Sequence, residues 1–394
     1  MIQRGWVVTF SSMIALAVIF GTSYSFGAFF SALSETFTAQ RADIAMMFGL
    51  AGFLYFVAGA GAGIAAVKFG PRLVSTLGML LLGFGAMSAS QADSIQQIYW
   101  SYGLGIGLGV ALVYTPVMGA VPPWFTSQRS LASGLASAGI GIGTLVVPPL
   151  VSLGIEQWQW RDTMFYLGCG SMVVGLAASS QIGMPDQEKT QAGHRNGLSL
   201  AEALRSKPFW LLFGICAIAG PSLFFPFAHL IQFARDQGIA EVQAASTIGF
   251  IGIGSIAGRF FIGFFADRYG RLATMGASNA MLAGSLLLWF SDPGWIGLCL
   301  FALWFGIAYG SVVALFPPLC MDFFGARSVT GVLGLVYSGA GIGNLLGPVG
   351  AGALFDRYGN YHASVAIAIA CALIAVLLSL AMMRWKRIHQ PTMY

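Results

Sequence analysis

Charged residues are scarce in this chain. Only 8% of its 394 residues are charged, whereas 57% are hydrophobic, and a soluble domain has about 25% charged residues. This composition predicts a polytopic membrane protein embedded in the lipid bilayer. The net charge of +5 is then explained by basic loops on one membrane face and does not indicate nucleic-acid binding.

Motifs for metal binding, redox chemistry and catalysis are also missing. The five cysteines stand singly in or beside apolar runs, without C-x-x-C or Cys/His spacing, so no metal and no cofactor is expected. No nucleophile and base occur at a catalytic spacing, so we do not expect an enzyme. The glycine strings at 103–109 and 139–143 follow no strand, and close helix packing explains them better than a phosphate loop does.

Long apolar runs make up most of the sequence. A helix needs about 20 apolar residues to span a bilayer. When the chain is divided at its charges and turn residues, the predicted spans are 6–30, 44–66, 73–91, 97–119, 130–153, 162–182, 208–231, 242–265, 272–291, 295–318, 329–353 and 362–383. The first run is too long for the core of a signal peptide, so we expect it to be retained.

The most polar stretch, 183–207, divides these spans six and six. The predicted fold class is therefore an all-α membrane protein with 12 transmembrane helices in two pseudo-symmetric six-helix bundles. The expected domains are an N-terminal bundle at 1–182, a cytoplasmic linker at 183–207 and a C-terminal bundle at 208–394. The oligomeric state stays open, and a monomer is compatible with the sequence.

Basic residues predict the orientation in the membrane. Of the 19 Lys and Arg residues, fourteen fall on the side of both termini, four fall on the opposite side, and one lies within a span. The cytoplasmic side of a membrane protein carries the excess of basic residues. Both termini are therefore predicted to be cytoplasmic, in a multi-pass protein of the inner or plasma membrane.

The two halves of the sequence repeat each other. The motif Gly63-x6-Gly70 recurs 200 residues later, and so do the glycines and the proline within 134–148. A parallel duplication of this kind is typical of secondary transporters, whose substrate site lies near the midplane between the halves. The one basic residue inside a span is Arg259, and its repeat partner is Gly59. The charge was therefore placed in one half only.

Arg259 is a permanent charge inside the apolar run 247–263. Translocon scales put the cost of an arginine at mid-bilayer at about 2.5–3.5 kcal/mol. Because a guanidinium does not lose its proton in proteins, this one needs water, a partner or an anionic ligand. A structural arginine satisfied by carbonyl groups is the alternative to a ligand-binding one.

The loop after the eighth span carries a recognisable motif. The stretch Gly263-Phe-Phe-Ala-Asp267-Arg268-Tyr-Gly270-Arg271 resembles the G-x-x-x-D-R-x-G-R signature of the major facilitator superfamily. The resemblance implies a conformational latch formed by Asp267, Arg268 and Arg271, with Lys68 and Arg72 in the first-half copy. That copy has Val67 where the family usually carries aspartate, so the usual first-half latch is in doubt.

Two further stretches narrow the resemblance to one branch of that superfamily. Residues 124–143 and 200–210 resemble signatures of monocarboxylate transporters and oxalate:formate antiporters. In that branch an arginine of the eighth span, four residues before the loop glycine, binds the substrate carboxylate. Arg259 stands four residues before Gly263, and a guanidinium can hold a carboxylate through two hydrogen bonds.

The same resemblance implies further residues that line the substrate site. These candidates are Tyr24, Tyr114, Ile140, Ser255, Tyr309 and Tyr337. Ordinary helix packing is the alternative for each of them. Carriers of the oxalate dianion have a lysine where this chain has Tyr337, so a single cation faces the expected cavity. One cation suits a monoanion better than a dicarboxylate.

The sequence gives fewer indications of which residue would bind a coupled proton. No acidic residue lies deep in a span, and Ser255 stands where animal monocarboxylate transporters carry an aspartate thought to take part in coupling. His229, in the seventh span, is the membrane-depth group that titrates near neutral pH, although it is equally compatible with a packed or interfacial histidine. Asp267 is the second proton-coupling candidate.

The sequence thus predicts a secondary active transporter that moves small monocarboxylates such as lactate or pyruvate, with proton symport, by alternating access. Carboxylate exchange remains the alternative. A non-transporting sensor usually adds a soluble extension, and the tails here are short. A drug exporter of the superfamily carries a Gly-Pro motif in the fifth span, where this chain has Leu-Val-Val-Pro-Pro-Leu at 145–150.

Overall fold

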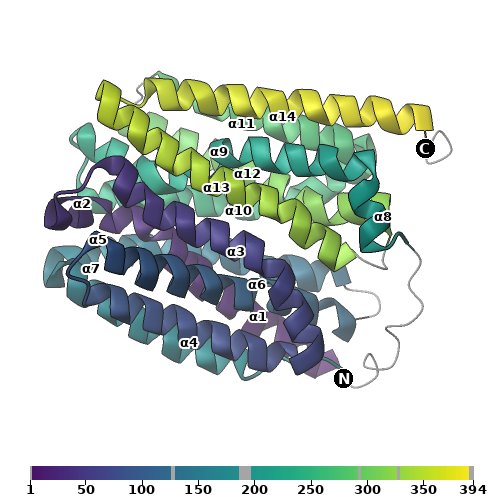
Figure 1. Ribbon diagram of the computed structural model, residues 1–394, viewed down its shortest axis with the longest axis horizontal. Helices are drawn as coiled ribbons and strands as arrows, with labels where there is room; N and C mark the ends of the chain where they lie inside the picture. Colours follow the sequence, from purple (N-terminus) through teal and green to yellow (C-terminus); the bar gives the residue numbers. More distant parts are fainter. Residues whose placement is uncertain (1, 126–128, 186–196, 292–293, 326–328, 390–394) are drawn as a thin grey trace.

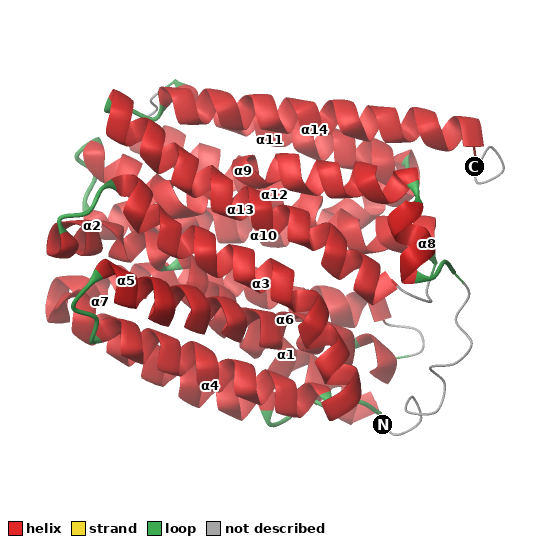
Figure 2. Ribbon diagram, viewed as in Figure 1, coloured by secondary structure: helices red, strands yellow, loops and turns green. Residues whose placement is uncertain are grey.

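The described residues form helices joined by short connections (Figure 2). The computed structural model describes residues 2–125, 129–185, 197–291, 294–325 and 329–389. The helices of the first half are α1 (Ile2–Tyr24), α2 (Phe26–Phe37), α3 (Arg41–Phe69), α4 (Pro71–Ser90), α5 (Ile95–Ile98), the π-helix η1 (Tyr99–Ile106), α6 (Gly107–Ala120), the 3₁₀ turn η2 (Pro122–Trp124) and α7 (Arg129–Ser179). Those of the second half are α8 (Leu200–Arg205), α9 (Lys207–Asp236), α10 (Glu241–Tyr269), α11 (Arg271–Phe290), α12 (Trp295–Phe324), α13 (Val329–Tyr358) and α14 (His362–His389).

The two halves of the chain lie side by side as two helical bundles (Figure 1). The first half runs from purple to blue and the second from teal to yellow, and both termini lie at the same end of the molecule. We call this the proximal end and the opposite one, where α3 begins and α9 ends, the distal end. The predicted pair of six-helix bundles is confirmed.

Within the described residues, eleven helical segments are long and apolar enough to cross a membrane, against twelve predicted spans. The difference arises in α7, which joins the predicted spans 130–153 and 162–182 into one element of 51 residues. Its backbone leaves helical geometry at Gln159, where φ is 65° and ψ is 167°. The chain therefore turns back at this residue, and two spans are present.

Several helices extend beyond the predicted edges because they include charged residues at which the prediction divided the chain. For example, α3 includes Lys68 and α9 ends at Asp236. The predicted first span is interrupted at Ser25, which separates α1 from α2. The Ser25 hydroxyl donates to the carbonyl of Gly21 at 2.6 Å, a side-chain bond that often accompanies a helix bend.

Glycines allow the two bundles to touch at mid-depth. A Cβ atom on Gly252 of α10 would lie 2.6 Å from the carbonyl oxygen of Gly141 in α7, and one on Gly141 would lie 2.8 Å from the carbonyl oxygen of Gly252. The backbones of these two helices therefore approach each other directly, as small residues permit in membrane helices.

Polar contacts join the halves at the distal end. Arg41, the first residue of α3, pairs with Asp236 at the end of α9, with Nη1 2.7 Å from one carboxylate oxygen and Nη2 2.9 Å from the other. The carboxylate of Asp356 in α13 accepts hydrogen bonds from the backbone N–H groups of Arg41 and Ala42, both at 3.0 Å. The distal end is thus held closed by groups from both bundles.

Candidate functional site

A small cavity of about 30 Å³ lies between the bundles. Its lining comes from both halves and is mostly aromatic. The residues around it are Phe20, Tyr24, Tyr55, Phe56, Tyr114, Ile140, Cys216, Leu223, Phe224, Arg259, Tyr309, Val313, Phe316, Tyr337 and Ala340. A cavity of this size holds about one or two water molecules, so the site is closely packed in this conformation.

Arg259 is the basic residue among these lining side chains. Its Nη1 donates to the hydroxyl of Ser255, one turn earlier on α10, at 2.7 Å. The guanidinium carbon lies 5.7 Å from the ring centroid of Tyr309, within the range of a cation–π contact. Its Nη2 is buried and has no hydrogen-bond partner among the described residues. The guanidinium therefore has donor capacity that the protein itself does not use.

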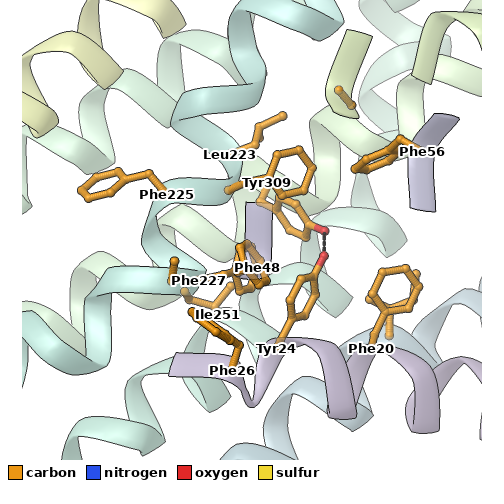
Figure 3. Close-up of a cluster of buried hydrophobic side chains, with 14 of the residues drawn as sticks. Phe20, Tyr24, Phe26, Phe48, Phe56, Leu223, Phe225, Phe227, Ile251 and Tyr309 are labelled. Atoms are coloured by element: carbon orange, nitrogen blue, oxygen red, sulfur yellow. Dashed lines mark hydrogen bonds between the residues drawn. The ribbon is translucent and has the colours of Figure 1, made fainter. Parts of the chain in front are cut away.

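A direct hydrogen bond between the halves borders the cavity. The hydroxyls of Tyr24 in α1 and Tyr309 in α12 lie 2.8 Å apart (Figure 3). The Tyr24 ring stacks on Phe227 with centroids 4.1 Å apart, and Phe227 also packs edge-on against Tyr309. Because Tyr24 is the last residue of α1, on its distal side, this cluster separates the cavity from the distal end.

Three more tyrosines complete the wall. Tyr55 of α3 and Tyr114 of α6 meet edge to face, with centroids 5.7 Å apart. Tyr337 of α13 faces Phe56 across the seam, with centroids 6.0 Å apart. Rings of this kind give a small ligand apolar walls and hydroxyl groups at once.

The structure brings the predicted substrate-site residues together. Arg259, Tyr24, Tyr114, Ile140, Tyr309 and Tyr337 all line the cavity, and Ser255 contacts it through its bond to Arg259. Their role in substrate binding stays a prediction. What the structure shows is that these residues surround one cavity between the two halves.

Sequence reasoning missed Tyr55 and Ala340, although the repeat contains a signal for both. At the offset of 200 residues, Tyr55 is the partner of Ser255, and Ala340 is the partner of Ile140. Because the two halves surround one central cavity, residues that face it in one half have partners that face it in the other.

His229 lies outside the cavity lining. Its ring is fully buried in α9, with Nε2 2.8 Å from the carbonyl oxygen of Pro348 and Nδ1 3.0 Å from the hydroxyl of Tyr361. Any part that His229 plays in proton coupling would act through these neighbours, not through contact with a ligand in the cavity.

The latch candidates lie at the proximal end. Arg271 pairs with Asp322 of α12, within the second half. The other candidates are exposed, and they are Asp267, Arg268, Lys68 and Arg72. For these four, the described residues give no ion pair between the halves in this conformation, and the latch stays a prediction.

Comparison with known proteins agrees with this architecture. Residues 12–333 and 220–392 match the model of the Major Facilitator Superfamily. The chain is 28% identical over 386 residues to monocarboxylate transporter 13 of Bos taurus, covering 92% of this chain and 86% of that one. It is 29% identical over 371 residues to monocarboxylate transporter 3 of Rattus norvegicus, covering 91% and 75%.

A crystal structure of the nucleoside transporter NupG superposes with a TM-score of 0.71, covering 96% of this chain and 99% of that one. The sequence identity is 17%, so this likeness concerns the fold alone.

Proposed function

Because this chain belongs to the Major Facilitator Superfamily, we propose that it carries small monocarboxylates such as lactate or pyruvate across the membrane, together with a proton. It is a transporter of the monocarboxylate transporter type, not an enzyme. The substrate, the proton and the alternating-access cycle are the proposed parts.

The observation that carries the proposal is the unused donor of Arg259. Its Nη2 is buried beside the cavity without a hydrogen-bond partner among the described residues. A buried donor on a charged group is costly to leave unpaired, and a carboxylate can accept from a guanidinium through two oxygens. A carboxylate bound in the cavity would supply the missing acceptor.

The size and charge of the site favour a substrate with one carboxylate. Among the lining residues Arg259 is the single Lys or Arg, and Tyr337 offers a hydroxyl in place of a second cation. A second carboxylate would have to be buried among aromatic rings without a counter-charge, which is unfavourable. The apolar walls suit the short carbon skeleton of a lactate-like acid.

The charge of Arg259 also explains why transport would require substrate. Closing both ends around an empty site buries a lone guanidinium, and breaking or lacking a buried ion pair costs several kcal/mol. A bound monoanion neutralises that charge, so the loaded carrier can rock between its two states. A proton that accompanies the anion would make the carrier a symporter, whereas a carrier that returns only when loaded would exchange anions.

Orientation follows from the distribution of basic residues. With the proximal end in the cytoplasm, the closed distal end faces the outside, and the structure corresponds to a conformation shut toward the exterior. We propose a location in the inner or plasma membrane.

Uptake of labelled L-lactate into proteoliposomes tests the proposal. We expect uptake to be driven by an inward proton gradient, to be inhibited by other monocarboxylates more than by dicarboxylates, and to be lost in Arg259→Ala. Uptake that does not depend on the proton gradient but requires an anion inside the vesicles would contradict symport and support anion exchange. Normal uptake by both Arg259→Ala and Arg259→Lys would overturn the assignment of the carboxylate anchor.

A further inference from the structure

A chain of hydrogen bonds connects a buried histidine to the polar contact that closes the distal end. Tyr361 lies just before α14, and its hydroxyl accepts from Nη1 of Arg41 at 2.7 Å and lies 3.0 Å from Nδ1 of His229. The same Nη1 of Arg41 donates to Asp236. His229 is thus one side chain away from the ion pair that joins the two bundles.

The partners of His229 determine which of its nitrogens carries the hydrogen. Nε2 lies 2.8 Å from the carbonyl oxygen of Pro348, which can only accept, so Nε2 must donate. In the neutral ring Nδ1 is then the acceptor, and the Tyr361 hydroxyl donates to it. Tyr361 can therefore accept from Arg41 and donate to His229 at the same time, and every polar group in this chain is satisfied.

Protonation of His229 would break this arrangement. Both ring nitrogens would become donors, so the Tyr361 oxygen would face donors from His229 and from Arg41, and its own hydrogen would lose its acceptor. A second positive charge would also lie one side chain from the Arg41 guanidinium. The closed distal end therefore suits a neutral His229.

The charged groups around His229 do not offset this effect. Asp236, on the same helix, is held by both terminal nitrogens of Arg41 and by Gln232. Asp356 of α13 is held by the backbone N–H groups at the start of α3. From α2, the neighbour of the imidazole is the ring of Phe30, with centroids 5.3 Å apart. The nearby carboxylates of Asp236 and Asp356 therefore already have hydrogen-bond partners in the closed state.

We infer that His229 is a proton-binding site that opens the distal gate, by the route His229–Tyr361–Arg41–Asp236, and does not act by touching substrate. This inference rests on the proposed function for its role in transport. His229 has no exposed surface in the closed state, so water reaches it when the bundles part at the distal end. The open state then binds the proton better, and a lower pH favours the open state.

Spin labels on the distal ends of the two bundles test this directly. Gln91 and Ser291 are exposed residues that directly follow α4 and α11, and they are repeat partners 200 residues apart. Neither belongs to the chain His229–Tyr361–Arg41–Asp236. Both would be replaced by cysteine in a chain whose five native cysteines are removed. Distances between the labels would be measured by double electron–electron resonance without substrate, from about pH 8 to about pH 5, where histidine side chains titrate.

We expect a longer distance to gain population several-fold as the pH falls, since linkage to one proton changes the open-to-closed ratio by at most about tenfold per pH unit. His229→Gln should abolish that dependence. The matched control is His362→Gln, which changes the exposed histidine directly after Tyr361 in the sequence and should keep the dependence. Tyr361→Phe keeps the ring packed beside Arg41 but removes the connecting hydroxyl, and it should weaken the dependence, because the part that passes through the Tyr361 hydroxyl is lost while His229 remains buried in the closed state.

The inference would be overturned if the distance did not depend on pH in the labelled chain that keeps His229 and Tyr361. Full pH dependence in His229→Gln or in Tyr361→Phe would overturn it as well. Because these measurements use no substrate, they can fail while lactate uptake succeeds. Uptake can equally fail while the gate responds to pH.

Discussion

Replacing Arg259 with methionine separates a ligand-binding arginine from a structural one. In the structure the Nη1 of Arg259 donates to the Ser255 hydroxyl, and its Nη2 is buried without a hydrogen-bond partner among the described residues. A hydrogen bond to a charged group contributes about 1.5–3 kcal/mol, and a buried unsatisfied polar group costs about 1–3 kcal/mol or more if charged. Arg259→Met removes both, so the two effects nearly cancel.

The Ser255 hydroxyl keeps an acceptor after the change, because a helical serine can donate to the carbonyl four residues earlier. We therefore expect the empty Arg259→Met variant to unfold at the same temperature as the parent chain or at a higher one. Ligand binding should separate the two proteins. At a concentration of 100 Kd a ligand stabilises the form that binds it by about 2.7 kcal/mol, and this gain should be absent from the variant.

The assay is thermal unfolding in detergent, followed by tryptophan fluorescence, with and without L-lactate. Uptake in proteoliposomes is measured on the same preparations. Arg384→Met is the matched control, because Arg384 is an exposed arginine near the end of α14, and it should keep both the stabilisation by lactate and the uptake. If empty Arg259→Met is strongly destabilised, or if lactate still stabilises it, Arg259 is a structural residue and the argument from its unused donor is refuted.

Two further pairs of substitutions test the helix packing and the charge of the site. Gly139→Ala should lower the unfolding temperature, because its Cβ would lie 2.0 Å from a backbone carbonyl of α1, whereas Gly134→Ala on the same helix meets nothing within 4 Å and should leave that temperature unchanged or raise it. Equal effects of the two changes would contradict this account of the helix contact. Tyr337→Lys adds a second cation to the cavity, so oxalate should compete with lactate better than in the parent chain, while Tyr337→Phe should not gain this property. Unchanged selectivity in Tyr337→Lys would show that the charge at this position does not set the preference for one carboxylate.

The sequence predicted the architecture well because a bilayer leaves few alternatives. Backbone groups in lipid must be satisfied within helices, so apolar runs and the repeat determine the number of spans and their grouping. The turn inside α7 was predicted as a gap between two spans, but its conformation at Gln159 was not. A non-glycine residue at positive φ is uncommon, and the local sequence Glu-Gln-Trp-Gln contains no glycine or proline to mark it.

The site was predictable where a residue conflicts with its surroundings. Arg259 stands out in an apolar run, but Phe56 and Phe224 look like ordinary packing residues, and only the fold shows that they line the cavity. His229 shows the opposite case. Its sequence position suggested a titrating group at membrane depth, whereas its partners, Pro348 and Tyr361, lie more than 100 residues away in the chain. No local pattern could have placed them.

If the two bundles tilt against each other as proposed, the close contact of Gly141 with Gly252 lies near their pivot. Interlocked side chains at that depth would have to withdraw from one another whenever the bundles tilted, and each withdrawal would lose packing. Here the two backbones approach each other closely, and the side chain of Ile256 is the nearest one to Gly141, so fewer side chains have to separate. Part of the barrier to such a motion then lies in the ion pair of Arg41 with Asp236 at the distal end and in the central hydrogen bond between Tyr24 and Tyr309. A carrier built this way can change its speed through residues at its rims, such as Arg41 and Asp236, while the geometry of its central site stays the same.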